Sequence, residues 1–400
     1  MKFATAISDE TDPGRAVASA FSSLCERLGA EPDYVVVAYT DAYEAGALAQ
    51  ALDALPKGVR VHASSSAAGV MTEAGYHARD GQAFAMLGVA DREGGFGVAA
   101  EPLDPSPREA GARAARRAIE RADRPGEVPA LLWLSVGPGV EEEVLHGIAD
   151  VVGPNVPVFG GTAAASTLSG GWSQIERGAA YTHAALVSAI FPSDDVSYFF
   201  SGGYAPTEHR GRVTRGGGRR IEQIDGEPAA VVYNRWTGGL IEGALGGGPI
   251  VHLTAFTPFG RVATSVGDVP YYTLIYPGTV DEAGAITLSA SVPEGGEILL
   301  MRGSQESLVE RAAGVTQEAL DAGGGRRIAP AGALVTYCGG CMMAVREHMP
   351  RVAAGVREKL GGVPFLGAFT FGEQGCLAPG VNAHGNLLIS AVVFGSAVDE

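Results

Sequence analysis

Residues 363–394 read VPFLGAFTFGEQGCLAPGVNAHGNLLISAVVF. Both ends of this stretch are apolar and rich in β-branched and aromatic residues, which is typical of buried strands, and a Gly-rich loop joins them. Two earlier stretches have the same layout: VPVFGGTAAASTLSGGWSQIERGAAYTHAALVSAIF over residues 156–191 and VRVHASSSAAGVMTEAGYHARDGQAFAMLGVA over residues 59–90. We therefore predict a repeated framework of strands and helices whose function lies in the loops between the paired strands.

Short strands alternate with helices in the rest of the chain. The run YVVVAY at 34–39 predicts a buried strand. Because each of the three blocks also holds two strands with no helix between them, we expect an α/β fold with mixed β-sheets layered against helices. Apolar residues at helical spacing predict helices over 16–28, 43–55, 106–121 and 140–151.

Four pairs of predicted elements lie about 200 residues apart, which indicates an internal duplication. A chain of 400 residues is also too long for one ordinary core. We expect two similar halves, an N-terminal domain over residues 1–220 and a C-terminal domain over residues 221–400. The paired starting points are Ala83 with Ala285, Ser106 with Ser304, Ala130 with Ala333 and Val156 with Val363.

The composition argues against several classes of partner. A net charge of −16 disfavours nucleic acid and anionic membranes, because binding phosphates requires Lys and Arg on the contacting face. The exception is residues 209–220 (HRGRVTRGGGRR), for which a solvated hairpin rim is a better interpretation than a site for phosphate or an acidic partner. There is no apolar leader and no apolar run of membrane-spanning length, so we expect a cytoplasmic protein.

The last block holds the richest set of candidate ligand-binding groups. Glu373 follows Phe371 and Gly372, and His384 and Asn386 precede the final strand. A carboxylate, an imidazole and an amide near glycine N–H groups can hold a zwitterion such as an amino acid, with its ammonium group on Glu373. An equally weighted alternative is that Glu373 and Asn386 bind the loop backbone and hold the two strand ends together.

The stretch CGGC at 338–341 lies where a strand becomes a helix. A thiol at a helix N-terminus has a lowered pKa, so Cys338 or Cys341 is a candidate reactive thiolate or redox pair. With Cys376 and His384 the pair would also make an incomplete zinc site. The favoured interpretation is structural, with small buried residues that let the loop and the helix approach closely.

No motif in the chain signals a reaction class. There is no GxSxG elbow, Walker loop or HExxH, and no GxGxxG between a strand and a helix. The histidines show no spacing typical of metal ligands, but haem needs only one, so spacing does not exclude haem. We expect a binding protein rather than an enzyme.

These motifs resemble the FIST family, a bacterial sensory module with N- and C-terminal parts. In the first half, ASSSAAGV at 63–70 and PVFGG at 157–161 resemble two conserved loops of the family, and IEQIDGEPA at 221–229 resembles its link segment. In the second half, GAFTFGE at 367–373 matches the family's G-F-x-T-Y-G-E. Cys341 stands where the family has an arginine after C-x-G/A, and HGN at 384–386 has one residue inserted into the family's His-Asn step.

The resemblance implies a sensory and signal-transduction protein that binds a small ligand, amino acids among them, and acts through a partner protein. Some stand-alone members of similar size are haem proteins that sense nitric oxide and regulate a histidine kinase, so haem is the alternative cofactor and a histidine kinase the alternative partner. A thiol-dependent enzyme using Cys338 or Cys341 is a second alternative. The residues expected to line the ligand site are Cys338, Gly339, Gly340, Phe371, Gly372, Glu373, His384 and Asn386, with Ser65, Gly160 and Gly161 from the matching loops of the first half.

Overall fold

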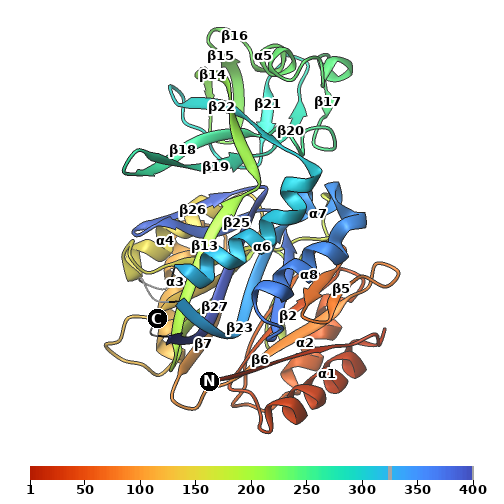
Figure 1. Ribbon diagram of the computed structural model, residues 1–400, viewed down its shortest axis with the longest axis vertical. Coiled ribbons are helices and arrows are strands. Elements are labelled where there is room, and N and C mark those ends of the chain that lie inside the picture. Colours follow the sequence, from red (N-terminus) through yellow and green to blue (C-terminus); the bar gives the residue numbers. More distant parts are fainter. Residues whose placement is uncertain (323–326, 399–400) are drawn as a thin grey trace.

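The chain folds into two bodies, shown in Figure 1 by a computed structural model that describes residues 1–322 and 327–398. The larger body holds three six-stranded sheets with helices packed on them, and we call it the three-sheet body. The smaller body holds a nine-stranded sheet, which we call the inserted sheet because it lies within the third repeat of the chain. Strand β14 (Tyr204–Gly217) leads into it and β22 (Glu297–Gly303) leads back to the helix α6.

The three-sheet body contains one unit three times. The first unit is formed by β1 (Lys2–Ile7), α1 (Pro13–Leu28), β2 (Tyr34–Tyr39), α2 (Ala45–Asp53), β3 (Arg60–Ser65), β4 (Val70–Thr72), β5 (Gly75–His77) and β6 (Phe84–Ala90). The second is formed by β7 (Gly95–Pro102), α3 (Pro107–Arg121), β8 (Leu131–Val136), α4 (Glu141–Val152), β9 (Val158–Thr162), β10 (Gln174–Glu176), β11 (Ala179–Tyr181) and β12 (Ala184–Phe191).

The third unit carries the insertion after its first strand. It is formed by β13 (Asp195–Gly202), α6 (Gln305–Asp321), β23 (Arg327–Cys338), α7 (Gly339–Ala344), η2 (Arg346–His348), α8 (Met349–Lys359), β24 (Phe365–Thr370), β25 (Glu373–Ala378), β26 (Val381–Gly385) and β27 (Leu388–Val398). Between β14 and β22 the inserted sheet adds β15 (Arg220–Ile224), β16 (Glu227–Pro228), α5 (Ala229–Trp236), η1 (Glu242–Ala244), β17 (Gly248–Pro249), β18 (Phe259–Val266), β19 (Val269–Ile275), β20 (Pro277–Val280) and β21 (Ile286–Leu288).

Each unit has the same strand order. The orders β1-β6-β2-β3, β7-β12-β8-β9 and β13-β27-β23-β24 are equivalent. The last pair of each set is parallel because a helix connects the two strands, and the other pairs are antiparallel. The prediction of an α/β fold with mixed sheets is therefore confirmed, and the three similar blocks of sequence are the second part of each unit, β3–β6, β9–β12 and β24–β27.

The Gly-rich loop of each block contains a hairpin that joins another unit's sheet. Hairpin β4-β5 pairs with β24, hairpin β10-β11 pairs with β3, and hairpin β25-β26 pairs with β9. All three exchanged contacts are antiparallel and extend a sheet beyond its last parallel strand. No unit therefore completes its own sheet, and the three are closed into a ring.

The structure explains most of the repeat seen near a spacing of 200 residues. Strands β8 and β23, β9 and β24, and helices α3 and α6 occupy the same places in the second and third units. The pair Ala83 and Ala285 is not equivalent, because Ala83 precedes β6 whereas Ala285 precedes β21 of the inserted sheet. A domain division at residue 220 stays a prediction; that position is the first residue of β15, which pairs with β14.

Gly160 and Gly161, both expected in the ligand site, lie in β9 where the exchanged hairpin joins it. Gly160 has φ +140°, and a Cβ there would overlap the carbonyl oxygen of Leu134. A Cβ at Gly161 would overlap the side chain of Thr370. Close approach of neighbouring strands therefore requires glycine at both positions.

We expect Gly160→Ala to destabilise the protein by on the order of 3 kcal/mol or more, since it adds an overlap with backbone to a strained φ. The control is Gly153→Ala, where φ is +77° but no atom lies within 4 Å of the added Cβ. The free energy of unfolding from urea denaturation measures both. Equal losses for the two variants would contradict the proposed close approach.

Candidate functional site

The loops that the sequence predicts to converge do meet in a ring at the ends of β3, β9 and β24. Three backbone hydrogen bonds link them in a cycle: Ala67 N to Phe369 O at 3.0 Å, Ala164 N to Ser65 O at 3.2 Å, and Phe371 N to Thr162 O at 3.1 Å. Each bond joins a loop of one unit to a loop or strand end of the next. Of the predicted residues, Ser65 and Phe371 take part in this cycle, and the predicted set does not line one cavity.

Glu373 is enclosed within this ring. Its side chain is fully buried and accepts hydrogen bonds from Thr370 Oγ1 at 2.7 Å and from Leu388 N at 3.1 Å. Burial raises the pKa of Glu373 well above that of an ordinary glutamate. The geometry matches the alternative in which this carboxyl group holds two strand ends together, and Glu373 lines none of the cavities described below.

The CGGC stretch is buried as well. Cys338 and Cys341 are 2% and 0% exposed, and the helix α7 that follows Cys338 has only six residues. Burial raises the pKa of Cys338, the opposite of the lowering expected for a thiol at a helix start. A Cβ on Gly340 would lie 2.7 Å from the ring of Tyr276, so close packing explains the small residues here.

The incomplete zinc site is not assembled among the described residues. The sulfur of Cys376 donates to Ala378 O at 3.0 Å, and no metal-ligating group of three includes a cysteine. The one such group in the described part of the chain is Glu141, Glu142 and His384, and the cationic Arg219 described below already lies against both carboxylates.

Asn386 and His384 lie at the junction between the two bodies. Asn386 Oδ1 accepts a hydrogen bond from Ser289 Oγ of the inserted sheet at 2.7 Å, and its Nδ2 donates to Phe371 O at 3.0 Å. The ring nitrogen Nδ1 of His384 lies 3.1 Å from Gln374 Nε2. Gly372 leaves room for this arrangement, because a Cβ there would lie 2.5 Å from His384 Cε1.

A second polar contact across the junction was not predicted from the sequence. The guanidinium of Arg219, between β14 and β15, donates to Glu141 at 2.5 Å and to Glu142 at 2.6 Å in the first turn of α4. Ser291 N donates to Glu142 at 2.8 Å. Two acidic residues of the three-sheet body thus hold two segments of the inserted sheet.

Glu142 is ionised at neutral pH in this setting. Its partial burial alone would raise its pKa, but the neighbouring His384, the charge of Arg219 and the hydrogen bond from Ser291 lower the pKa of Glu142 to about 2. The carboxylate therefore stays available as an anion over the physiological pH range.

A cavity of about 480 Å³ opens beside this contact, between α4 and β26 on one side and β18 and β19 on the other. Glu142 and His384 line it together with Arg261 of β18. The Nε atom of Arg261 is buried without a hydrogen-bond partner, and among the described residues no acidic side chain pairs with this guanidinium. The rest of the wall is largely apolar and includes Leu145, Ala149, Ile275, Val381 and Ala383.

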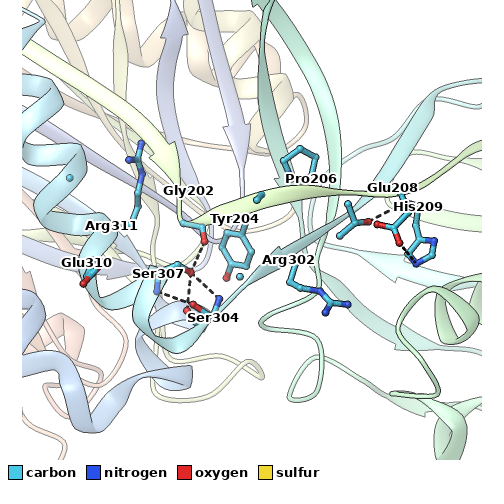
Figure 2. A pocket seen from close by; sticks show the side chains of 15 residues that line it. Gly202, Tyr204, Pro206, Glu208, His209, Arg302, Ser304, Ser307, Glu310 and Arg311 are labelled. Atoms are coloured by element: carbon cyan, nitrogen blue, oxygen red, sulfur yellow. Dashed lines mark hydrogen bonds and ion pairs between the residues drawn. The ribbon is translucent and has the colours of Figure 1, made fainter.

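The larger cavity, of about 1080 Å³, is an open groove along the two segments that connect the bodies (Figure 2). Ser304 and Ser307 cap each other at the start of α6. A terminal nitrogen of Arg311 pairs with Glu318 at 2.8 Å, while its Nε is buried without a hydrogen-bond partner. Figure 2 shows Arg302 and Arg311 pointing away from each other, so they do not converge on one anion. A third cavity, of about 30 Å³, is lined by Ser65 and Gly161 among others and has room for little more than a water molecule.

The chain was compared with known families and structures. The FIST N domain matches residues 33–227 and the FIST C domain matches residues 229–376. Among solved structures, a cyanuric acid hydrolase from A. caulinodans is 10% identical with a TM-score of 0.38 over 99% of both chains. PurLQS from Thermotoga maritima is 10% identical with a TM-score of 0.25 over 95% of this chain and 83% of that one. No curated protein matches the sequence.

The two family matches together span most of the chain, and the protein belongs to the FIST family, whose domains are associated with sensing in signal transduction. The predicted resemblance is therefore confirmed. The likenesses to the two solved structures are too weak to bear on this chain. In the part of the chain that the structure describes, no helix is long and apolar enough to cross a membrane.

The burial of Glu373 predicts a pH-dependent difference between the wild type and Glu373→Gln. The pKa of Glu373 is higher in the folded protein than in the unfolded chain, where it is about 4.5. The wild type therefore loses stability relative to the variant as the pH rises above about 4.5. The expected gain of the variant is at most about 1.4 kcal/mol per pH unit until the folded-state pKa is reached. Urea unfolding between pH 5 and 8 measures it, and a pH-independent difference would contradict the buried, protonated carboxyl group.

Proposed function

We propose that this protein is a sensor that binds a small ligand, an amino acid or a similar zwitterion, in the junction cavity and signals through a partner protein. The observation that carries the proposal is the pairing of charges in this cavity. Glu142 supplies an ionised carboxylate, and Arg261 supplies a guanidinium with a buried, unpartnered Nε. A volume of about 480 Å³ also lies in the ordinary range of small-molecule sites.

The cavity offers complementary groups for both ends of an amino acid. The planar guanidinium of Arg261 can bind a carboxylate through two parallel hydrogen bonds from its terminal nitrogens. Glu142 can accept hydrogen bonds from an ammonium group. The apolar wall formed by Leu145, Ile275 and Val381 favours a hydrocarbon side chain. This placement moves the expected ammonium partner from the buried Glu373 to Glu142.

The position of the cavity supports a signalling role. Its walls come from α4 and β26 of the three-sheet body and from β18 and β19 of the inserted sheet. A ligand that contacts both bodies favours the relative arrangement in which it binds best. A partner protein that recognises one arrangement would then respond to the ligand.

Among the described residues the two buried histidines, His62 and His384, do not favour the haem alternative. Both ring nitrogens of His62 are hydrogen-bonded, one to Ser135 Oγ and one to Ser188 Oγ, each at 2.8 Å. Burial lowers the pKa of His62 to about 3. His384 lines the junction cavity, but the charged Glu142 and Arg219 beside it do not suit the apolar face of a porphyrin. These residues do not fit haem.

A thermal-shift screen of the proteinogenic amino acids, followed by calorimetric titration of the hits, tests the proposal. We expect a hit with an apolar side chain, and we expect Arg261→Gln to weaken its binding tenfold or more, roughly the contribution of a charge-assisted hydrogen bond. The matched control is Arg302→Gln, which alters an exposed arginine of the larger groove.

The control variant should bind as the wild type does. Glu373→Gln should also leave the affinity unchanged, because that carboxyl group lies outside the cavity. The placement is wrong if no zwitterion binds, or if the hits survive Arg261→Gln and are lost with Arg302→Gln or Glu373→Gln.

A further inference from the structure

Among the described residues, Arg219 makes the ion pairs of the inserted sheet with the three-sheet body, and it lies beside the proposed ligand site. Two other arginines of the basic stretch form ion pairs, and their partners lie within the inserted sheet. Arg215 pairs with Glu222, and Arg220 pairs with Glu222 and Asp281. Arg219 instead reaches α4 of the second unit. This arginine therefore links the two bodies.

The two carboxylates that pair with Arg219 differ in solvent exposure. The Glu141 side chain is 3% exposed and also accepts hydrogen bonds from Thr162 Oγ1 at 2.9 Å and Gly139 N at 3.0 Å. The Glu142 side chain is 27% exposed and lines the junction cavity, which Glu141 does not. A cationic group that enters the cavity can therefore contact Glu142 while Glu141 stays with Arg219.

The segment that carries Arg219 is the tight turn of the β14-β15 hairpin, in which Gly217 pairs with Arg220. Arg219 follows Gly216, Gly217 and Gly218, whose φ angles are +141°, +156° and +55°. Leu288 N donates to Arg219 O at 2.9 Å and Val292 N donates to Gly218 O at 2.8 Å, so residues 216–220 and 288–292 are joined. The same second segment supplies Ser291 N to Glu142 and Ser289 Oγ to Asn386. A change in the hydrogen bonds of Glu142 therefore affects both segment 216–220 and segment 288–292.

We propose that Arg219 and the ammonium group of the ligand compete for Glu142, so that ligand binding loosens the contact of segments 216–220 and 288–292 with α4. This inference rests on the proposed function and assigns its regulation to one residue. Coupling between two contacts at one group is reciprocal, so removal of Arg219 must strengthen ligand binding. An arginine that merely shaped the cavity would weaken binding when removed.

The first test is calorimetric titration of the strongest amino-acid hit into the wild type, Arg219→Gln and Arg220→Gln. We expect Arg219→Gln to bind about twofold to fivefold more tightly, the range that corresponds to a partly exposed ion pair. Arg220→Gln removes a neighbouring arginine whose ion pairs stay within the inserted sheet, and its affinity should equal that of the wild type.

The second test is hydrogen–deuterium exchange, and its main comparison uses the wild-type protein with and without the amino acid. The amino acid should speed exchange of the backbone amides in 216–220 and 288–292. Its deaminated analogue, which keeps the carboxylate and side chain but lacks the ammonium group, should bind without this change. Arg219→Gln should show the faster exchange with no ligand present.

The outcomes separate the two proposals. If no zwitterion binds either the wild type or Arg219→Gln, the proposed function fails and the competition fails with it. If a zwitterion binds in the cavity but Arg219→Gln binds it no more tightly, or the exchange of 216–220 and 288–292 does not increase, the function stands and the competition alone is overturned.

Discussion

The exchange of three hairpins between units is the constraint on which the rest of the structure depends. A strand pair such as β25 and β26 completes the sheet of the second unit through β9, while its own unit receives β4 and β5 from the first. An unpaired sheet edge exposes a row of backbone donors and acceptors, and the exchange covers one edge in each unit. It also brings the loops at 65–67, 162–164 and 369–373 into one ring, where Gly160 and Gly161 permit the close approach.

The junction between the bodies differs in chemistry from the ring. Inside the ring, carboxyl and thiol groups are buried and their pKa values are raised, as at Glu373 and Cys338. At the junction, Glu142 and Arg219 form ion pairs beside a cavity. Apolar contacts also cross the junction, because Leu274 and Met301 of the inserted sheet belong to the same core cluster as Cys341 and Leu387. In our proposal the ligand acts on the polar contacts beside the cavity, apart from the ring.

The sequence was sufficient to predict many of the helices and strands and part of the repeat. The apolar run at 34–39 is β2, and the three similar blocks form the second part of each unit, from β3 to β6, β9 to β12 and β24 to β27. The sequence could not show that each loop carries a hairpin for another unit, because short strands such as Val70–Thr72 have too few residues for a clear alternation. The insertion of residues 204–303 into the third unit also made Ala285 look like a repeat of Ala83.

The candidate site was only partly predictable for a related reason. The sequence identified His384 and Asn386, which lie at the junction, but also Glu373 and Cys338, whose burial depends on tertiary packing. Glu142 looked like an ordinary acidic residue in the first turn of a helix, and Arg219 looked like part of a solvated basic rim. Only the packing of the two bodies shows that these residues meet, with Arg261 across the cavity.

A crystal structure of the protein with its tightest-binding amino acid tests the central claim most directly. The account predicts ligand density in the junction cavity, with the carboxylate on the guanidinium of Arg261 and the ammonium group on Glu142. Density in the groove along residues 202–209 and 302–314, or a ligand bound within the ring at Glu373, would contradict it.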